Sequence, residues 1–314
     1  MDEYLTYIPN SYSLGYKATN KLYILDEYGI YEYNGNHYSM PTSVNVPEFI
    51  KEIPDYLFAG FKQIDTVTFS DTLEDIGEYA FANTSIKSLE IPGSVKETGY
   101  ASFEFCTKLT SVTLNEGLEV ISGQSFMSCD INSINIPSTV KKIESNAFSS
   151  NSIGGNLIIP DSVEVIAPGA FMINDIAGIK IGSGLNELGN QAFSILTKLE
   201  TIEVDSKNTV FYSSSNALIQ KEDKMMVVSS MDATIPSDVL ILGESLFAGL
   251  ETKSITIPKT VTKISKGVFF LCSNLEAIYY EGTKEEFSNI TLQDDWNTGL
   301  DLKYIICSDE NYII

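Results

Sequence analysis

Ile134-Asn-Ile-Pro-Ser-Thr-Val-Lys-Lys-Ile143, followed by Ala147-Phe148, is the stretch that decides the fold. It returns almost unchanged as Ile255-Thr-Ile-Pro-Lys-Thr-Val-Thr-Lys-Ile264, followed by Val268-Phe269. Self-similarity at a fixed period indicates a repeat architecture. Working outward from these copies, we place eleven units, separated by steps of 22 or 23 residues apart from one step of 31. The units begin at Val44, Val67, Leu89, Val112, Ile134, Leu157, Ile179, Ile202, Ala233, Ile255 and Ile278.

Each repeated column has a physical role. Apolar residues two apart, such as Val112 and Leu114, predict a short strand at the start of every unit, and stacked units then form a parallel sheet. A proline often follows and ends the strand. An apolar pair three apart returns the chain across the core, often with a glycine next that permits a tight corner. The glycines are Gly77, Gly99, Gly189 and Gly243.

A phenylalanine column closes each unit and is expected to fill the centre of the coil. Its members are Phe81, Phe103, Phe126, Phe148, Phe171, Phe193, Phe247 and Phe269. Three residues further on stand Cys106, Cys129 and Cys272, where other units carry Thr84, Asn151 and Asn174. We expect this position to turn inward and to satisfy backbone groups. A disulfide between Cys106 and Cys129 on adjacent units is a second interpretation.

Both ends depart from the repeat, as solenoid ends must to shield the core. Residues 1–43 are interpreted as a tyrosine-rich cap, with Leu22–Leu25 and Gly29–Tyr33 as the two strands of a hairpin. The repeats occupy 44–277, and an insertion at about 205–232 is expected to form a hairpin around Lys221-Glu-Asp-Lys224. Residues 278–314 form an irregular C-terminal cap, in which Thr283-Lys-Glu-Glu286 is a capping box that starts a short helix.

Composition excludes several classes of function. Acidic residues outnumber basic ones by 42 to 20, and the formal net charge is −22. Such a field repels phosphate, so we expect no nucleic-acid partner. No apolar run approaches the roughly 18 to 20 residues of a membrane helix, so we expect no membrane insertion. The four cysteines are too few for a disulfide scaffold and show no metal-binding spacing.

No motif for catalysis emerges. The single histidine, His37, lies in the tyrosine-rich cap, so a histidine triad or a multi-histidine metal site is not expected. Ser125 follows Gly123 as in a nucleophile elbow, but the closing glycine is missing and Ser125 occupies the small-residue column. We expect no enzyme, no cofactor and no metal site. A hydrolase that uses paired acids is the remote alternative, because carboxylates are abundant.

Candidate binding residues point outward between the two apolar positions of each predicted strand, from the face of the inner sheet. They are Glu90, Thr113, Asn135, Ile158, Lys180, Glu203, Thr256 and Tyr279. This row is interpreted either as an extended binding face or as a merely soluble sheet surface. Phe211 and Tyr212 of the insertion are further candidates, because insertions project from a rigid scaffold; decoration or a join between two repeat blocks is the more common role of an insertion. In the cap, Tyr28, Tyr31, Tyr33 and Tyr38 could stack on a partner, although a tyrosine-filled core is the alternative.

The unit I-x-I-P-x-S-V-x-x-I-G-x-x-A-F-x-x-C-x-x-L, as in Leu89–Leu109, resembles the BspA-like class of leucine-rich repeats over about residues 44–307. The resemblance implies a right-handed, curved solenoid that is β-rich with short parallel strands, turns and little helix. It also implies a secreted or cell-surface protein with adhesion or host-protein binding, any signal peptide lying outside this sequence. We therefore expect a monomeric, non-enzymatic module that binds an extracellular protein or glycan. A structural spacer within a larger secreted protein is the alternative.

Overall fold

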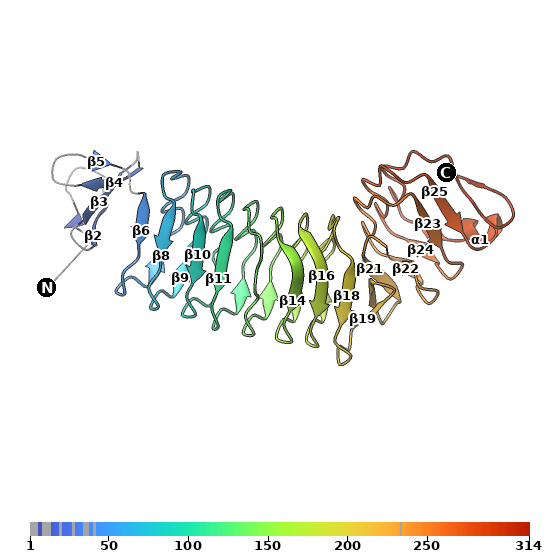
Figure 1. Ribbon diagram of the computed structural model, residues 1–314, viewed down its shortest axis with the longest axis horizontal. Helices are drawn as coiled ribbons and strands as arrows, with labels where there is room; N and C mark the ends of the chain where they lie inside the picture. The colour runs from blue at the N-terminus through green and yellow to red at the C-terminus, as the bar shows by residue number, and fades with distance from the viewer. Residues whose placement is uncertain are drawn as a thin grey trace.

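A computed structural model describes residues 6–7, 14–18, 21–26, 29–33, 38–39, 42–232 and 234–314 of the chain. The repeats stack side by side into an elongated β-solenoid with short parallel strands (Figure 1). Within the described residues, the one α-helix is α1 (Lys284–Ser288), and no helix is long and apolar enough to cross a membrane. The predicted fold class, a β-rich repeat solenoid with little helix, is confirmed.

The first strands of most units pair in parallel, in four successive groups along the solenoid, which we together call the first sheet. In β10 and β11, Leu89 pairs with Val112 and Ile91 with Leu114, so the register repeats the sequence period. The unit that begins at Ile134 has no such strand, and neither do residues 234–236 of the unit after the insertion. The strands are β6 (Ser43–Asn45), β8 (Thr66–Thr68), β10 (Ser88–Ile91), β11 (Ser111–Leu114), β14 (Gly154–Ile159), β16 (Asp175–Ile181), β18 (Thr201–Val204), β23 (Ser254–Ile257) and β25 (Ala277–Tyr280).

A second set of parallel strands lies where the sequence predicted only a return across the core. Each of these strands is two residues long and carries one inward apolar side chain, such as Ile143. They are β7 (Glu52–Ile53), β9 (Asp75–Ile76), β12 (Val120–Ile121), β13 (Lys142–Ile143), β15 (Val165–Ile166), β17 (Glu187–Leu188), β22 (Ile241–Leu242), β24 (Lys263–Ile264) and β26 (Thr291–Leu292). The core lies between these strands, the first sheet and the phenylalanine turns.

The phenylalanine column is confirmed as core packing. Neighbouring rings from Phe81 to Phe193 stack with centroids 5.4 to 5.5 Å apart. We call the turns around this column the turn edge. Its backbone bonds to the next unit, as when the Phe81 amide donates to the Ser102 carbonyl at 2.7 Å. Residues two before and two after the column adopt positive φ, for example Tyr79 (53°) and Asn83 (59°) around Phe81.

The position three residues after the column phenylalanine turns inward, as predicted. The Asn174 amide donates to the carbonyls of Phe148 and Phe171 at 2.9 and 3.0 Å, and its oxygen accepts from the Ile153 amide at 3.0 Å. Cys129 occupies the same position, and its Sγ donates to the Phe103 carbonyl at 3.2 Å. All four cysteines are free thiols.

The reason for glycine after each return strand differs from the expected one, which was a tight corner. Gly99 does not adopt positive φ, but a Cβ there would lie 2.2 Å from the Ile76 carbonyl oxygen of the preceding unit. Any side chain would therefore push two units apart. The glycine is needed for close approach between neighbouring backbones rather than for backbone freedom.

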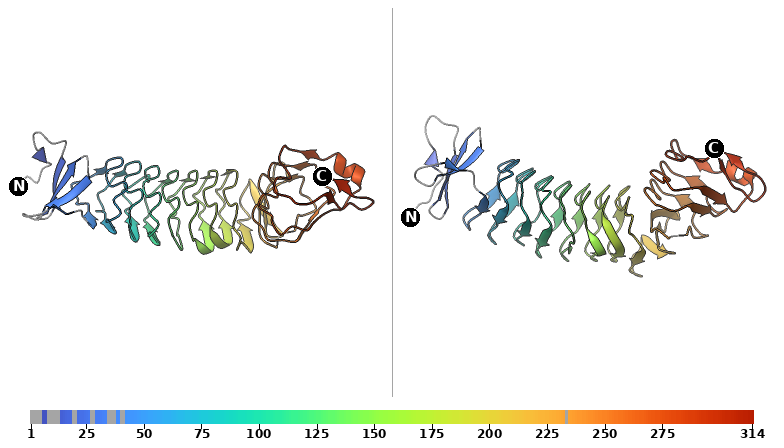
Figure 2. Two further views of the ribbon diagram at one scale, coloured as in Figure 1. Left: turned by 90° about the horizontal axis from the view of Figure 1, so that it is seen from above. Right: turned by 45° about the horizontal axis from the view of Figure 1, so that its top comes forward.

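The predicted insertion forms the expected hairpin and divides the core. Strand β20 (Ala217–Gln220) pairs antiparallel with β21 (Met225–Ser229) and with β19 (Phe211–Ser214). Leu218 and Val228 belong to the N-terminal core, whereas Ile219 and Met226 belong to the C-terminal core. The hairpin is thus apolar on both faces. Beyond it the C-terminal units are turned relative to the N-terminal ones (Figures 1 and 2).

The two ends, predicted to be caps, differ from the repeats and from each other. Strands β1 (Thr6–Tyr7), β2 (Leu14–Ala18), β3 (Lys21–Asp26), β4 (Gly29–Tyr33) and β5 (Tyr38–Ser39) form one antiparallel sheet that contains the predicted hairpin. The predicted capping box at Thr283 starts α1, with the Glu286 amide donating to Thr283 Oγ1. Trp296 is buried, and β27 (Tyr304–Ile305) pairs with β28 (Tyr312–Ile313). His37 and Tyr28, and the side chains of Tyr31, Tyr33 and Tyr38, lie outside the described residues.

Candidate functional site

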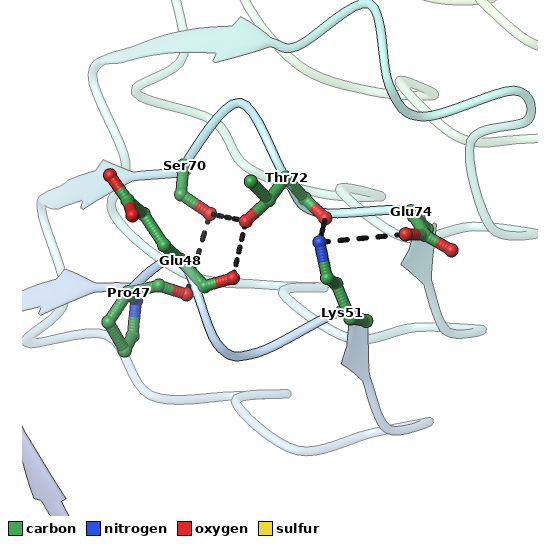
Figure 3. A network of polar contacts seen from close by, with 6 residues as sticks. All are labelled: Pro47, Glu48, Lys51, Ser70, Thr72 and Glu74. Atoms are coloured by element: carbon green, nitrogen blue, oxygen red, sulfur yellow. Dashed lines mark hydrogen bonds and ion pairs between the residues drawn. The ribbon is translucent and has the colours of Figure 1, made fainter.

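Polar side chains in the loops after the first sheet are bonded from one unit to the next. Figure 3 shows the first such pair of loops, where the Thr72 hydroxyl donates to the Glu48 carbonyl and Lys51 Nζ donates to the Thr72 carbonyl at 3.0 Å. Lys51 also lies 3.6 Å from a Glu74 carboxylate oxygen. These groups hold adjacent loops together and are not free for a partner.

Carboxylates further along the same loops are held in the same way. The Ser138 backbone amide and hydroxyl both donate to Glu116 at 3.0 Å, and they hold the pKa of Glu116 below its ordinary value. Ser183 bonds to Asp161 through the same two groups, at 2.7 and 3.0 Å, and lowers the pKa of Asp161. Glu116 and Asp161 are therefore explained by building the solenoid.

The predicted row on the first sheet differs from these loops. We call it the sheet row, which is Glu90, Thr113, Asn135, Ile158, Lys180, Glu203, Thr256 and Tyr279, and all eight residues are exposed. Glu90 accepts a hydrogen bond from Asn115 at 2.9 Å. The side chains of the other members make no hydrogen bond or ion pair within residues 42–232 and 234–314. The fold fixes their spacing but leaves their polar groups unpaired.

The sheet row ends in an aromatic patch that the sequence did not reveal. Tyr279 is 43 % exposed and forms a parallel bridge with Ile306, the residue that follows β27. Tyr304 is 47 % exposed and lies opposite Ile313, which is 79 % exposed, on β28. The sequence offers a short apolar run at Tyr304–Ile306, which is too short to show which side chains face outward.

The two candidates on the insertion have different surroundings. Phe211 is 3 % exposed and packs in the N-terminal core, so it supplies no binding surface, contrary to the expectation from the sequence. Tyr212 is half-buried, and its hydroxyl donates to Asp238 at 2.7 Å while Lys224 Nζ lies 4.8 Å from its ring centroid. Burial and the bond to Asp238 raise the pKa of Tyr212 to about 12. Tyr212 thereby joins the insertion to the C-terminal units.

The described residues offer little for catalysis. Burial raises the pKa of the Cys106 and Cys129 thiols, which opposes thiolate formation. Ser125 Oγ is buried and has no hydrogen-bond partner. Within the described part of the chain, no group of three or more histidine, cysteine or acidic residues is placed to hold a metal ion.

This architecture, a parallel solenoid with a phenylalanine turn edge, defines a leucine-rich repeat protein. A family model described as BspA type leucine-rich repeat region matches residues 34–154, 155–221 and 227–305. The chain belongs to this family of BspA-type leucine-rich repeat proteins. A search of proteins with curated function finds no match.

Solved structures share the fold at low sequence identity. A leucine-rich repeat protein from Eubacterium ventriosum is 18% identical with a TM-score of 0.51, over 86% of this chain and 72% of the other. One from Bacteroides ovatus is 17% identical with a TM-score of 0.50, over 91% and 89%. The pneumococcal vaccine antigen PcpA is 22% identical with a TM-score of 0.44, and the match covers 78% of this chain but only 52% of that protein.

Proposed function

We propose that this chain is a non-enzymatic, monomeric binding module of a secreted or cell-surface protein, and that the sheet row contacts a protein or glycan partner. The observation that carries the proposal is the contrast between unpaired groups on the sheet row and bonded groups in the loops. Polar groups that the fold does not use can exchange water for a partner without breaking internal bonds.

The geometry of the sheet row favours an extended partner. Parallel strands lie about 4.8 Å apart, so Ile158, Lys180 and Glu203 follow one another at a fixed interval. Thr256 and Tyr279 form a second such pair beyond the inserted hairpin. Tyr279, Tyr304 and Ile313 at its C-terminal end supply the aromatic and apolar area that concentrates binding energy in protein interfaces. Family membership supports the location at the cell surface.

A binding screen tests this function. The purified chain is applied to an array of extracellular matrix and serum proteins and to a glycan array, and each ligand found is tested against Lys180→Ala/Glu203→Ala and Tyr279→Ser/Tyr304→Ser variants. Glu164→Ala/Glu187→Ala is the matched control, because these residues are also exposed and lie on or beside the second strands. We expect weaker binding for both sheet variants and unchanged binding for the control.

Two outcomes would contradict the proposal. Uniformly negative arrays would favour the spacer, whose units serve only to hold other domains apart. A ligand that binds all the variants equally would place the binding surface away from the sheet row. Size-exclusion chromatography with light scattering tests the monomer.

A further inference from the structure

Three tyrosines form an exposed cluster on consecutive units of the turn edge. We call Tyr56, Tyr79 and Tyr100 the tyrosine ladder. The rings of Tyr56 and Tyr79 stack with centroids 5.0 Å apart and planes 11° apart, and Tyr100 meets Tyr79 edge-on at 5.6 Å. Tyr56 is 57 % exposed and Tyr100 is 39 % exposed. The cluster therefore presents aromatic surface over several successive units.

The fold does not require aromatic residues at these positions. Tyr56 and Tyr79 stand two residues before the column phenylalanine and adopt φ of 58° and 53°. The equivalent residues of the next units are Ala101 and Gln124, with φ of 51° and 56°. Core packing in the same turns is already supplied by Phe58 and Phe81, whose rings stack at 4.9 Å. The solenoid tolerates a small or a polar residue here, so packing does not explain the tyrosines.

Tyr100 extends the ladder toward the following unit. Its ring atoms would lie 3.3 Å from a Cβ at Gly123, so the ring covers this glycine. Its hydroxyl donates to Gln124 Oε1 at 2.7 Å, which fixes the ring in place. A ring held in position before binding loses little conformational entropy when a ligand arrives.

Carboxylates accompany the ladder. Asp55 precedes Tyr56, Glu78 precedes Tyr79, and the Glu78 amide donates to Asp55 Oδ1 at 2.7 Å. Burial raises the pKa of Tyr79, and interactions with Tyr100 and with the negative charge of Glu104 raise it further. Burial raises the pKa of Glu104 itself, and its carboxylate has no hydrogen bond or ion pair within residues 42–232 and 234–314. A partly buried carboxylate without a partner favours an incoming cation.

We infer that the tyrosine ladder is a docking site for an arginine- or lysine-rich segment of a partner protein. Guanidinium and ammonium groups bind to tyrosine rings through cation–π contacts, and Glu104 with its acidic neighbours supplies the counter-charge. The net charge of −22 attracts a basic partner over a longer range. This inference rests on the proposed function in that the partner is a protein, but it concerns a surface distinct from the sheet row.

Peptide binding tests the inference directly. A fluorescent (Arg-Gly)5 peptide and its neutral (Gln-Gly)5 counterpart are titrated with the full chain at 150 mM NaCl, about physiological ionic strength, and anisotropy is recorded. We expect the arginine peptide alone to bind. Tyr56→Ala/Tyr79→Ala/Tyr100→Ala should weaken binding about tenfold or more, and Glu104→Gln about threefold. Replacement of the three tyrosines by phenylalanine should retain most of the affinity.

Matched controls separate this site from general attraction to an acidic surface. Tyr279→Ala/Tyr304→Ala removes exposed tyrosines elsewhere and should leave peptide affinity unchanged. Alanine is native at the ladder position as Ala101, and thermal melting verifies that the triple variant is folded. Equal affinity of the triple variant and the unchanged chain would overturn the inference. So would binding of cellohexaose or chitohexaose that depends on the ladder while peptide binding does not, which would assign the site to carbohydrate.

These readouts distinguish failure of the inference from failure of the proposed function. The Lys180→Ala/Glu203→Ala variant should bind the arginine peptide as the unchanged chain does. A partner that binds this variant as tightly as the unchanged chain would contradict the proposed function and leave the peptide result standing. Equal binding of the arginine peptide and its neutral counterpart would contradict the inference but not the proposed function.

Discussion

The turn edge and the sheet row lie on the same repeats but use their side chains in opposite ways. At the turn edge, Phe126 is stacked on both sides and Asn174 bonds to three backbone groups. On the sheet row, Lys180 and Glu203 repeat at the same interval without a bonded partner among the described residues. The difference shows that a residue position can recur in every unit without having a structural role. Repetition with saturated contacts marks the fold, and repetition with unpaired groups marks a candidate for binding.

The largest expected effect comes from removing a ring in the middle of the turn edge. Phe126→Ala should lower the free energy of unfolding by about 3–5 kcal/mol, because it leaves a cavity between Phe103 and Phe148. Guanidinium denaturation followed by circular dichroism measures this loss. Phe126→Leu is the control and should lose less. A loss below about 1 kcal/mol for the alanine variant would remove the basis of the comparison.

The next effect concerns the inward polar position. Asn174→Ala should lower the free energy of unfolding by about 2–3 kcal/mol, because the Phe148 and Phe171 carbonyls and the Ile153 amide lose their partner in a buried site. The same denaturation experiment measures it. Asn174→Cys should recover part of the loss, since Cys129 donates to a phenylalanine carbonyl from the same position. Equal losses for alanine and cysteine would disprove this role of the hydrogen bonds.

A smaller effect is expected where the insertion meets the C-terminal units. Tyr212→Phe removes the bond to Asp238 and should lower the free energy of unfolding by about 1 kcal/mol near neutral pH. The pKa of Tyr212 is raised from 10.0 to about 12 in the folded state, so its contribution is complete below pH 10 and is lost as the pH rises through 12.

The stability difference between Tyr212→Phe and the unchanged chain should therefore shrink between pH 10 and pH 12. Thermal melts across this range measure the difference, and the phenylalanine variant cancels the contribution of the other tyrosines. At acid pH the same hydrogen bond is weakened by a change of pH in the opposite direction. The bond holds the pKa of Asp238 below its ordinary value of 3.8, so this stabilisation is lost as the pH falls through the folded-state pKa. A difference independent of pH would contradict the assignment.

The smallest effect is expected on the sheet row. Lys180→Ala/Glu203→Ala should change the free energy of unfolding by less than about 0.5 kcal/mol, because neither side chain has a bonded partner in the described chain. The same denaturation assay measures it. Destabilisation as large as that of Asn174→Ala would show that the sheet row also serves the fold.

Much of the fold could be predicted from the sequence because the period sets the register. The pairing of Leu89 with Val112 follows directly from the repeat step. The second strands could not be predicted, because two residues such as Lys142–Ile143 are too few to show an alternating pattern. The reason why position 99 must be glycine could not be predicted either, because the crowding there comes from the Ile76 carbonyl of the preceding unit.

The candidate surfaces were predicted unevenly for physical reasons. Thr113 and Lys180 lie between inward apolar residues, so alternation correctly gave their exposure. The alternation of apolar and polar residues could not show whether Phe211 lies in the core or on the surface, because the inserted hairpin contacts apolar core on both faces. The tyrosine ladder was missed because positive φ at Tyr56 and Tyr79 sets their direction. The signal that could have found it is a tyrosine two residues before Phe58 and again before Phe81.

The paired left-handed residues of the turn edge also have an evolutionary consequence. Hydrogen bonds between units impose their conformation, since Ile173 and Ile195 adopt φ of 57° and 58° although β-branched residues disfavour this region, and Asn83 adopts 59°. Such positions are free to drift in sequence while the backbone stays fixed. The turn edge thus combines an invariant frame with interchangeable surface residues, so a lineage could acquire or lose a recognition surface there by single substitutions without refolding the solenoid.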